Sequence, residues 1–263
     1  MATQAKAGRL TVGEGAEARE IAYVALPATP AGRDLPGLVW LGGFKSDMTG
    51  TKATALEQFA AASGRACLRF DYSGHGASGG TFEDGTISRW LEESLAVIRS
   101  QTKGRQVLVG SSMGGWIALL VARALAEAGE QDRIAGMVLI APAVDFTSTL
   151  IEPGLSKKAK DEIEKTGRWM RPSDYSPDPY PITKALLQDG RKHQIFGTAI
   201  RTWGPAHILQ GMQDPDVPWR HALALVEHLA DDPATLSIIS DGDHRLSRDQ
   251  DIARLIAAVA EMK

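Results

Sequence analysis

Short apolar runs alternate with amphipathic segments along most of this chain. The runs are rich in Val, Ile and Leu, and apolar residues recur near helical spacing in the segments between them. Six runs are predicted as core strands: Leu38–Leu41, Ala66–Phe70, Gln106–Val109, Gly136–Ile140, His207–Leu209 and Leu236–Ile239. Five segments are predicted as helices: Thr51–Ser63, Ser88–Gln101, Met113–Ala128, Arg220–Leu229 and Arg248–Met262. The alternation predicts an α/β fold, a mostly parallel sheet with helices on both faces.

Two parts of the chain depart from this rhythm. Arg9–Val12 and Glu20–Ala25 flank a Gly-Glu-Gly turn with no helix after either, which predicts an antiparallel hairpin at the sheet edge. From Pro142 to Pro205 there is no strand signal, only a charged helical stretch at Ser156–Lys165 with scattered prolines and aromatics. We interpret residues 1–263 as a single domain with a helical cap insertion at about 142–205. Such a cap would cover the carboxyl ends of the strands, where open α/β sheets bind ligands.

The segment Gly110-Ser111-Ser112-Met113-Gly114 lies between a predicted strand and a predicted helix. A G-x-S-x-G sequence at such a junction is typical of a nucleophile elbow, whose glycines leave room for a strained turn that exposes the serine hydroxyl. Ser112 is therefore the candidate nucleophile. A serine hydroxyl needs a base, a carboxylate that orients the base, and donors for the oxyanion.

The candidate acid and base follow the elbow in the chain, each after a predicted core strand. Asp214 stands three residues after Gly211, and Asp216 is its nearest rival, although Asp216 could instead cap the following helix. His244 follows the last strand, where a loop histidine can reach back to the elbow. We prefer Asp214 as the acid and His244 as the base.

The other histidines have structural interpretations. His75 lies in a glycine-rich turn that it could hydrogen-bond, and His207 begins a strand. His221 and His228 share one helical face and are expected to contact solvent or the sheet rather than a metal. His193 belongs to the cap and could contact substrate.

The oxyanion requires two backbone N–H donors. The Met113 amide is the first candidate, and the Phe44 amide, in Leu41-Gly42-Gly43-Phe44, is the second. Gly43 remains an alternative because sequence does not settle one residue of register. We expect no metal and no cofactor, since the chain shows no H-E-x-x-H and no compact His and carboxylate cluster at ligand spacing.

Charge and cysteine content indicate which class of partner the protein binds and in which compartment it is found. The formal net charge is -3 with both signs interspersed, so we expect a small-molecule partner rather than nucleic acid or a membrane. Cys67 is the single cysteine, which favours a reducing compartment. Met1–Arg9 has too few apolar residues for a secretory signal, and no apolar run approaches the roughly 18 residues of a membrane span. These features predict a cytoplasmic protein.

Several segments together resemble one family. They are Phe44–Ala53, Arg69–Gly74, Gly110–Trp116, Gly211-Met212 with Val217–Trp219, Asp243–Arg245, and the cap segment Gly167–Tyr175. They are similar to the abhydrolase domain-containing protein 10 family of α/β-hydrolases, known for mitochondrial palmitoyl-protein thioesterase activity and for hydrolysis of mycophenolic acid acyl-glucuronide. The resemblance implies the α/β-hydrolase fold and Ser112, Asp214 and His244 as the triad. The chain lacks a long Arg-rich leader, so we expect a cytoplasmic relative rather than a mitochondrial one.

These features predict a serine hydrolase of esters or thioesters whose substrate preference comes from the cap. Trp169, Arg171 and Tyr175 are the candidate substrate-binding residues, and Met170, Tyr180 and Phe196 could add apolar surface. Arg168 and Arg171 could meet an anionic leaving group or could be solvated surface charges. The alternative is a hydrolase-fold binding or receptor protein with little turnover.

Overall fold

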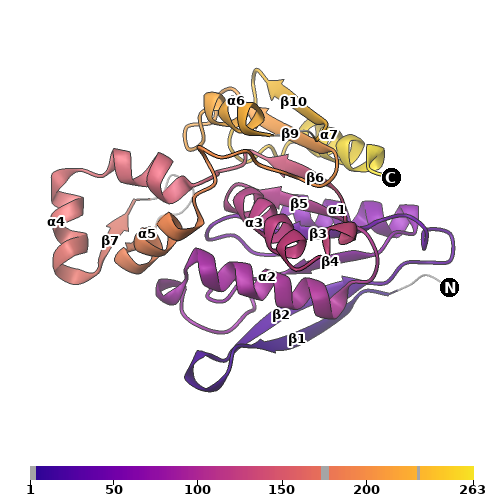
Figure 1. The fold of residues 1–263 in the computed structure, drawn as a ribbon, viewed down its shortest axis with the longest axis horizontal. Coiled ribbons are helices and arrows are strands. Elements are labelled where there is room, and N and C mark those ends of the chain that lie inside the picture. Colours follow the sequence, from indigo (N-terminus) through magenta and orange to yellow (C-terminus); the bar gives the residue numbers. More distant parts are fainter. Residues whose placement is uncertain (1–3, 173–177, 230–231) are drawn as a thin grey trace.

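A computed structural model describes residues 4–172, 178–229 and 232–263. Its centre is an eight-stranded sheet in the order β1-β2-β4-β3-β5-β6-β9-β10 (Figure 1). From β4 to β10 every neighbouring pair is parallel, as the apolar runs predicted. The strands are β1 Lys6–Val12, β2 Arg19–Leu26, β3 Gly37–Leu41, β4 Cys67–Phe70, β5 Gln106–Ser111, β6 Ile134–Ile140, β9 Ala206–Gly211 and β10 Ala234–Ile239.

Helices pack on both faces of the sheet and divide the core in two. One apolar cluster joins the sheet to α1 and α7, and the other joins it to α2, α3 and α6. The helix α3 is buried around most of its circumference, with Trp116 and Leu120 fully buried, because it lies between the sheet and α2. The bounds are α1 Thr51–Ser63, α2 Ile87–Gln101, α3 Met113–Glu127, α6 Trp219–His228 and α7 Asp249–Glu261.

The predicted edge hairpin is present. β1 pairs antiparallel with β2, and β2 pairs antiparallel with β4, so these two strands extend the parallel sheet on one side. The predicted core strands and helices are confirmed to within about two residues at nearly every end. The α/β-hydrolase arrangement expected from the sequence therefore holds for the sheet and its covering helices.

Between β6 and β9 the chain leaves the sheet and forms the segment at the left of Figure 1. It contains α4 (Lys157–Thr166) and α5 (Lys184–Gly190), together with two strands that the sequence analysis did not expect, β7 (Arg168–Arg171) and β8 (Tyr180–Thr183). These strands pair antiparallel. Four residues with two charged ends, as in β7, are too short to show period-two alternation convincingly.

Asp145 ties the two ends of this cap to each other. Its buried carboxylate accepts hydrogen bonds from the backbone N–H groups of Ile195 (3.0 Å) and Phe196 (2.9 Å). Burial raises the pKa of Asp145, and these backbone hydrogen bonds act in the opposite direction. The cap is thus anchored at its start and end beside the carboxyl ends of the strands.

Candidate active site

Ser112 lies at the turn between β5 and α3. Its backbone has φ 55° and ψ -118°, a conformation that non-glycine residues rarely adopt. A Cβ on Gly110 would lie 2.3 Å from the Gly114 carbonyl oxygen, and a Cβ on Gly114 would lie 2.1 Å from the Leu41 carbonyl oxygen. Both glycines are therefore required by the close packing of this turn, as the motif predicted.

A chain of hydrogen bonds joins Ser112 to His244 and Asp214. The Ser112 hydroxyl oxygen lies 3.1 Å from His244 Nε2, and His244 Nδ1 lies 2.7 Å from Asp214 Oδ2. With Nδ1–H donating to the carboxylate, Nε2 is left with the lone pair that accepts the serine hydrogen. The structure thus brings the three predicted residues together in the geometry that activates a serine.

The loop after β9 holds Asp214 rigidly. Asp214 Oδ1 accepts hydrogen bonds from the N–H groups of Asp216 and Val217, both at 2.8 Å, and its side chain is fully buried. Gln210 Nε2 donates to Oδ2 at 3.3 Å. Gln210 is a residue that the sequence analysis missed, because a glutamine within a strand gives no local signal of this contact.

Asp216 lies on the same loop but faces another partner. Its carboxylate is 3.8 Å from the Arg171 guanidinium of the cap, and the N-cap residue of α6 is Pro218. Asp214, Asp216 and His244 also place one potential ligand atom each within 4.8 Å of the others, a cluster that the sequence did not reveal. The hydrogen bond between His244 and Asp214 already uses two of these atoms.

The turn after β3 brings a second backbone segment to Ser112. Gly43 approaches so closely that a Cβ there would be 3.5 Å from the Ser112 Cβ. Ser46 N–H closes the turn on the Gly43 carbonyl at 3.2 Å, and the Phe44 N–H has no acceptor among the described residues. The Met113 N–H, at the first position of α3, is likewise without an acceptor in that part of the chain. Both amides belong to residues that line the cavity at Ser112.

Two cavities meet at Ser112 and His244. The first, of about 520 Å³, has an apolar wall and several charged lining residues. The second, of about 610 Å³, lies beside α1 and the His244 loop and is lined mainly by polar and charged residues. The apolar wall consists of Phe44, Met113, Ala143, Phe146, Leu150 and Ile151. Its last four members were missed because they fall in the cap insertion, where no pattern marked them.

Only some of the predicted substrate-binding residues line the cavities at Ser112. Arg171 lines the first cavity, as does Tyr180, whose ring centroid lies 6.0 Å from the Arg171 guanidinium. Trp169 packs against the main core cluster and lines neither cavity at Ser112. Tyr175 lies outside the described residues. Phe196 packs against the rings of two histidines on α6 and lines neither cavity.

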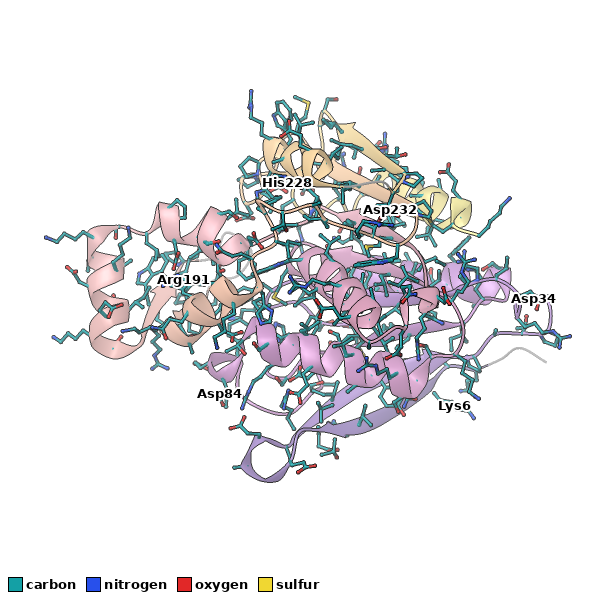
Figure 2. The ribbon with its side chains drawn as sticks, viewed as in Figure 1. Lys6, Asp34, Asp84, Arg191, His228 and Asp232 are labelled. Atoms are coloured by element: carbon teal, nitrogen blue, oxygen red, sulfur yellow. The ribbon has the colours of Figure 1, made fainter. Side chains whose placement is uncertain are left out.

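The other histidines lie away from Ser112. His193 contacts the Ser88 hydroxyl (2.7 Å) and lines neither cavity, so the expected contact with substrate is not supported by its position. His228, labelled in Figure 2, lies on α6, where its Nδ1 contacts the Ala224 carbonyl and its ring packs on Phe196. His75 is buried in its turn and hydrogen-bonds to Ser73, as predicted.

Lys52, in the first turn of α1, supports the loop that carries His244. Its ammonium donates to the carbonyl of Arg245 and lies 3.4 Å from the Ser247 hydroxyl. Burial lowers the pKa of Lys52 to about 8, and the positive charge of Arg245 adds to this effect. The lysine thus links α1 to the residue that follows the candidate base.

Comparison with protein families gives an independent match. The profile described as the Alpha/beta hydrolase family matches residues 28–262. The palmitoyl-protein thioesterase ABHD10, mitochondrial, of Pongo abelii is 33% identical over 228 residues, which cover 86% of this chain and 72% of that protein.

Solved structures agree. A protein from Agrobacterium vitis S4 is 51% identical with a TM-score of 0.94, and the match covers 98% of this chain and 99% of that one. The alpha/beta hydrolase domain-containing protein 10 from mouse is 30% identical with a TM-score of 0.83 and 97% of both chains covered. The agreement extends over the cap as well as the sheet.

Proposed function

The chain belongs to the alpha/beta hydrolase family, among the relatives of abhydrolase domain-containing protein 10, and on that premise we propose that it hydrolyses carboxylic esters or thioesters through Ser112. The observation that carries the proposal is the hydrogen-bonded chain from Ser112 through His244 to Asp214. It supports acyl transfer because a buried carboxylate orients an imidazole whose free nitrogen meets an exposed serine hydroxyl.

The reaction has two steps. In the first, Ser112 Oγ attacks the acyl carbonyl while His244 Nε2 takes its proton, and His244 then gives that proton to the leaving alcohol or thiol. In the second, a water molecule loses its proton to His244 and attacks the acyl-enzyme, which releases the acid and restores the serine. Asp214 holds the imidazole in the Nδ1–H tautomer throughout.

The negative charge of each tetrahedral intermediate needs donors. We assign them to the Phe44 and Met113 amides, because both residues line the cavity at Ser112 and neither N–H has an acceptor within the described part of the chain. A single donor of this kind contributes roughly 10²–10³ in kcat in a serine protease. Gly43 stays an alternative second donor because a Cβ built on it would lie 3.5 Å from the Ser112 Cβ.

The two cavities suggest where the halves of the substrate lie. The wall that includes Phe146, Leu150 and Ile151 fits an apolar acyl group, and the charged cavity beside α1 fits a polar leaving group. We therefore expect Leu150→Trp to raise KM for longer acyl chains and to leave short-chain esters nearly unchanged. The Pongo abelii relative is named a palmitoyl-protein thioesterase, which makes thioesters the first compounds to compare with oxygen esters.

A labelling and turnover assay tests the proposal. A fluorophosphonate should modify wild type but not Ser112→Ala, and wild type should turn over p-nitrophenyl butyrate while Ser112→Ala loses at least about 10⁴-fold. Ser63→Ala, a serine at the end of α1 far from the cavities, is the matched control and should behave as wild type. Labelling without turnover across a panel of esters and thioesters would contradict the proposal and favour a binding protein.

The cytoplasmic location predicted from the sequence stays a prediction. No helix within the described ranges is both long and apolar enough to cross a bilayer. Cell fractionation with an antibody against the native protein would test the location.

A further inference from the structure

His75 forms a hydrogen bond with the turn that carries the Phe44 amide. In this turn, the Lys45 N–H donates to His75 Nε2 at 3.0 Å. Lys45 itself has φ 56°, in the left-handed region that non-glycine residues rarely adopt because it strains the backbone. A strained turn of this kind keeps its shape only where surrounding contacts hold it.

The other side of the imidazole fixes its tautomer. His75 Nδ1 lies 3.1 Å from the Ser73 carbonyl oxygen, so Nδ1 is the donor and Nε2 carries the lone pair that accepts from Lys45. Both ring nitrogens are thereby used, and His75 lines neither cavity at Ser112. The residue cannot act as a spare base without breaking these contacts.

An aromatic cage keeps the ring in place. The His75 ring lies 5.7 Å from Tyr72, 5.1 Å from Phe82 and 5.3 Å from Trp90, measured between centroids. The Phe44 ring packs on Phe82 and Trp90 as well, at 4.9 and 5.9 Å. Burial lowers the pKa of His75 to about 4, so the imidazole stays neutral and able to accept at neutral pH. The backbone and the side chain of the turn are thus held by the same cluster.

We infer that His75 is a positioning residue for the hydrolysis, because its Nε2 holds the Lys45 amide and thereby aims the adjacent Phe44 N–H at the oxyanion formed on Ser112. The inference rests on the proposed function, since an oxyanion forms at this site only if Ser112 attacks an acyl carbonyl. It assigns to the residues after β4 a part in transition-state stabilisation that neither the triad nor the cap provides. Loss of the acceptor should weaken transition-state binding and leave ground-state binding unchanged.

Three substitutions separate the acceptor from the rest of the side chain. His75→Phe keeps an aromatic ring and removes both nitrogens, His75→Asn keeps a polar group near Ser73 but does not reach Lys45, and His75→Gln can place an oxygen near the Nε2 position. Tyr72→Phe is the matched control, because it alters a buried polar atom in the same cage and leaves the turn untouched.

Steady-state hydrolysis of p-nitrophenyl butyrate and inhibition by phenylboronic acid, which forms a tetrahedral adduct on serine, give the readouts. We expect His75→Phe and His75→Asn to lower kcat by about 10²-fold with KM within about 3-fold, and to weaken boronic acid inhibition by a similar factor. Inhibition by butyrate, a ground-state ligand, should stay within about 3-fold. His75→Gln should recover at least about 10-fold of the lost kcat, and Tyr72→Phe should match wild type.

A folded His75→Phe protein with kcat within 3-fold of wild type would overturn the inference. Near-UV circular dichroism establishes whether that variant is folded, and where it is not, the comparison of His75→Asn with His75→Gln decides, equal kcat values counting against the inference. Failure of the proposed function looks different: wild type itself would then turn over no ester beyond the Ser112→Ala background.

Discussion

Asp214→Asn tests which carboxylate orients the imidazole. Asp214 Oδ1 accepts two backbone N–H groups at 2.8 Å, so an asparagine at this position should keep its carbonyl oxygen there. Its NH₂ group would then face His244 Nδ1 in place of Oδ2, which accepts from His244 at 2.7 Å in the native site. An NH₂ donor forces the imidazole into the Nε2–H tautomer, which cannot take the proton of Ser112.

The expected loss follows from that change of tautomer. The corresponding substitution in a serine protease lowers kcat by about 10⁴-fold with the geometry intact, which equals about 5.5 kcal/mol of transition-state free energy. Gln210 Nε2 also donates to the carbonyls of Gly211 (3.1 Å) and Val217 (3.0 Å), so in this variant it loses only its 3.3 Å contact with position 214 and keeps its place. We therefore expect a folded protein with a severe catalytic defect.

Asp216→Asn is the matched control, with the same change of charge two residues away. Asp216 and Arg171 are 3.8 Å apart, and their side chains remain 28% and 36% exposed, so solvent screens the pair and the effect on kcat/KM should stay below about 5-fold. The assay is steady-state turnover of p-nitrophenyl butyrate at pH 7.5 for both variants, with thermal unfolding as a check on folding. If Asp216→Asn lost two orders of magnitude while Asp214→Asn stayed active, the assignment of the acid would be wrong.

Three further predictions concern stability. His75 has a pKa near 6.5 in the unfolded chain and about 4 in the folded protein, because burial disfavours its charged form. The free energy of unfolding should therefore fall as pH drops below 6.5, by about 3 kcal/mol at pH 4. Urea titrations should show this decrease in wild type and a smaller one in His75→Gln. Ser112→Gly should relieve the φ 55° strain and raise Tm by about 2–4 °C in differential scanning fluorimetry while turnover is lost, and an unchanged or lower Tm would argue against stored strain. Glu93→Gln should cost about 3 kcal/mol in urea unfolding because it leaves buried Arg19 partly unpaired, whereas Glu92→Gln, whose native side chain is 56% exposed, should cost less than about 1 kcal/mol; similar losses in both would refute the distinction.

The elements of the sheet were predictable because burial on both faces leaves a strong signature. Strands such as β5 and β6 are continuous apolar runs, and the helices between them show one apolar face. The distances among Ser112, Asp214 and His244 follow from the same regularity. Parallel strands end at one edge of the sheet, so residues that immediately follow β5, β9 and β10 meet there although up to 132 positions separate them.

The cap and the walls of the cavities lacked such a signature. β7 pairs with β8 across an intervening segment rich in proline, and Pro181 contributes no N–H to the pair. Phe146, Leu150 and Ile151 line the cavity at Ser112 because the cap folds back over the strand ends. No hydrophobic periodicity in the sequence predicts that fold of the cap. Trp169 was a reasonable candidate by residue type, yet the pairing of β7 directs it to the core.

His75 shows why residue type alone misassigns roles in such a site. Sequence analysis placed it correctly in a hydrogen-bonded turn, but its contact with Lys45 comes from a residue 30 positions away, in the turn after the adjacent parallel strand β3. Because β3 and β4 are neighbours, the turns at their carboxyl ends must pack on each other, and one of these turns faces Ser112. His75, which has a structural role in its own turn, therefore also affects the oxyanion donor in the turn after β3, because it accepts a hydrogen bond from the Lys45 backbone amide.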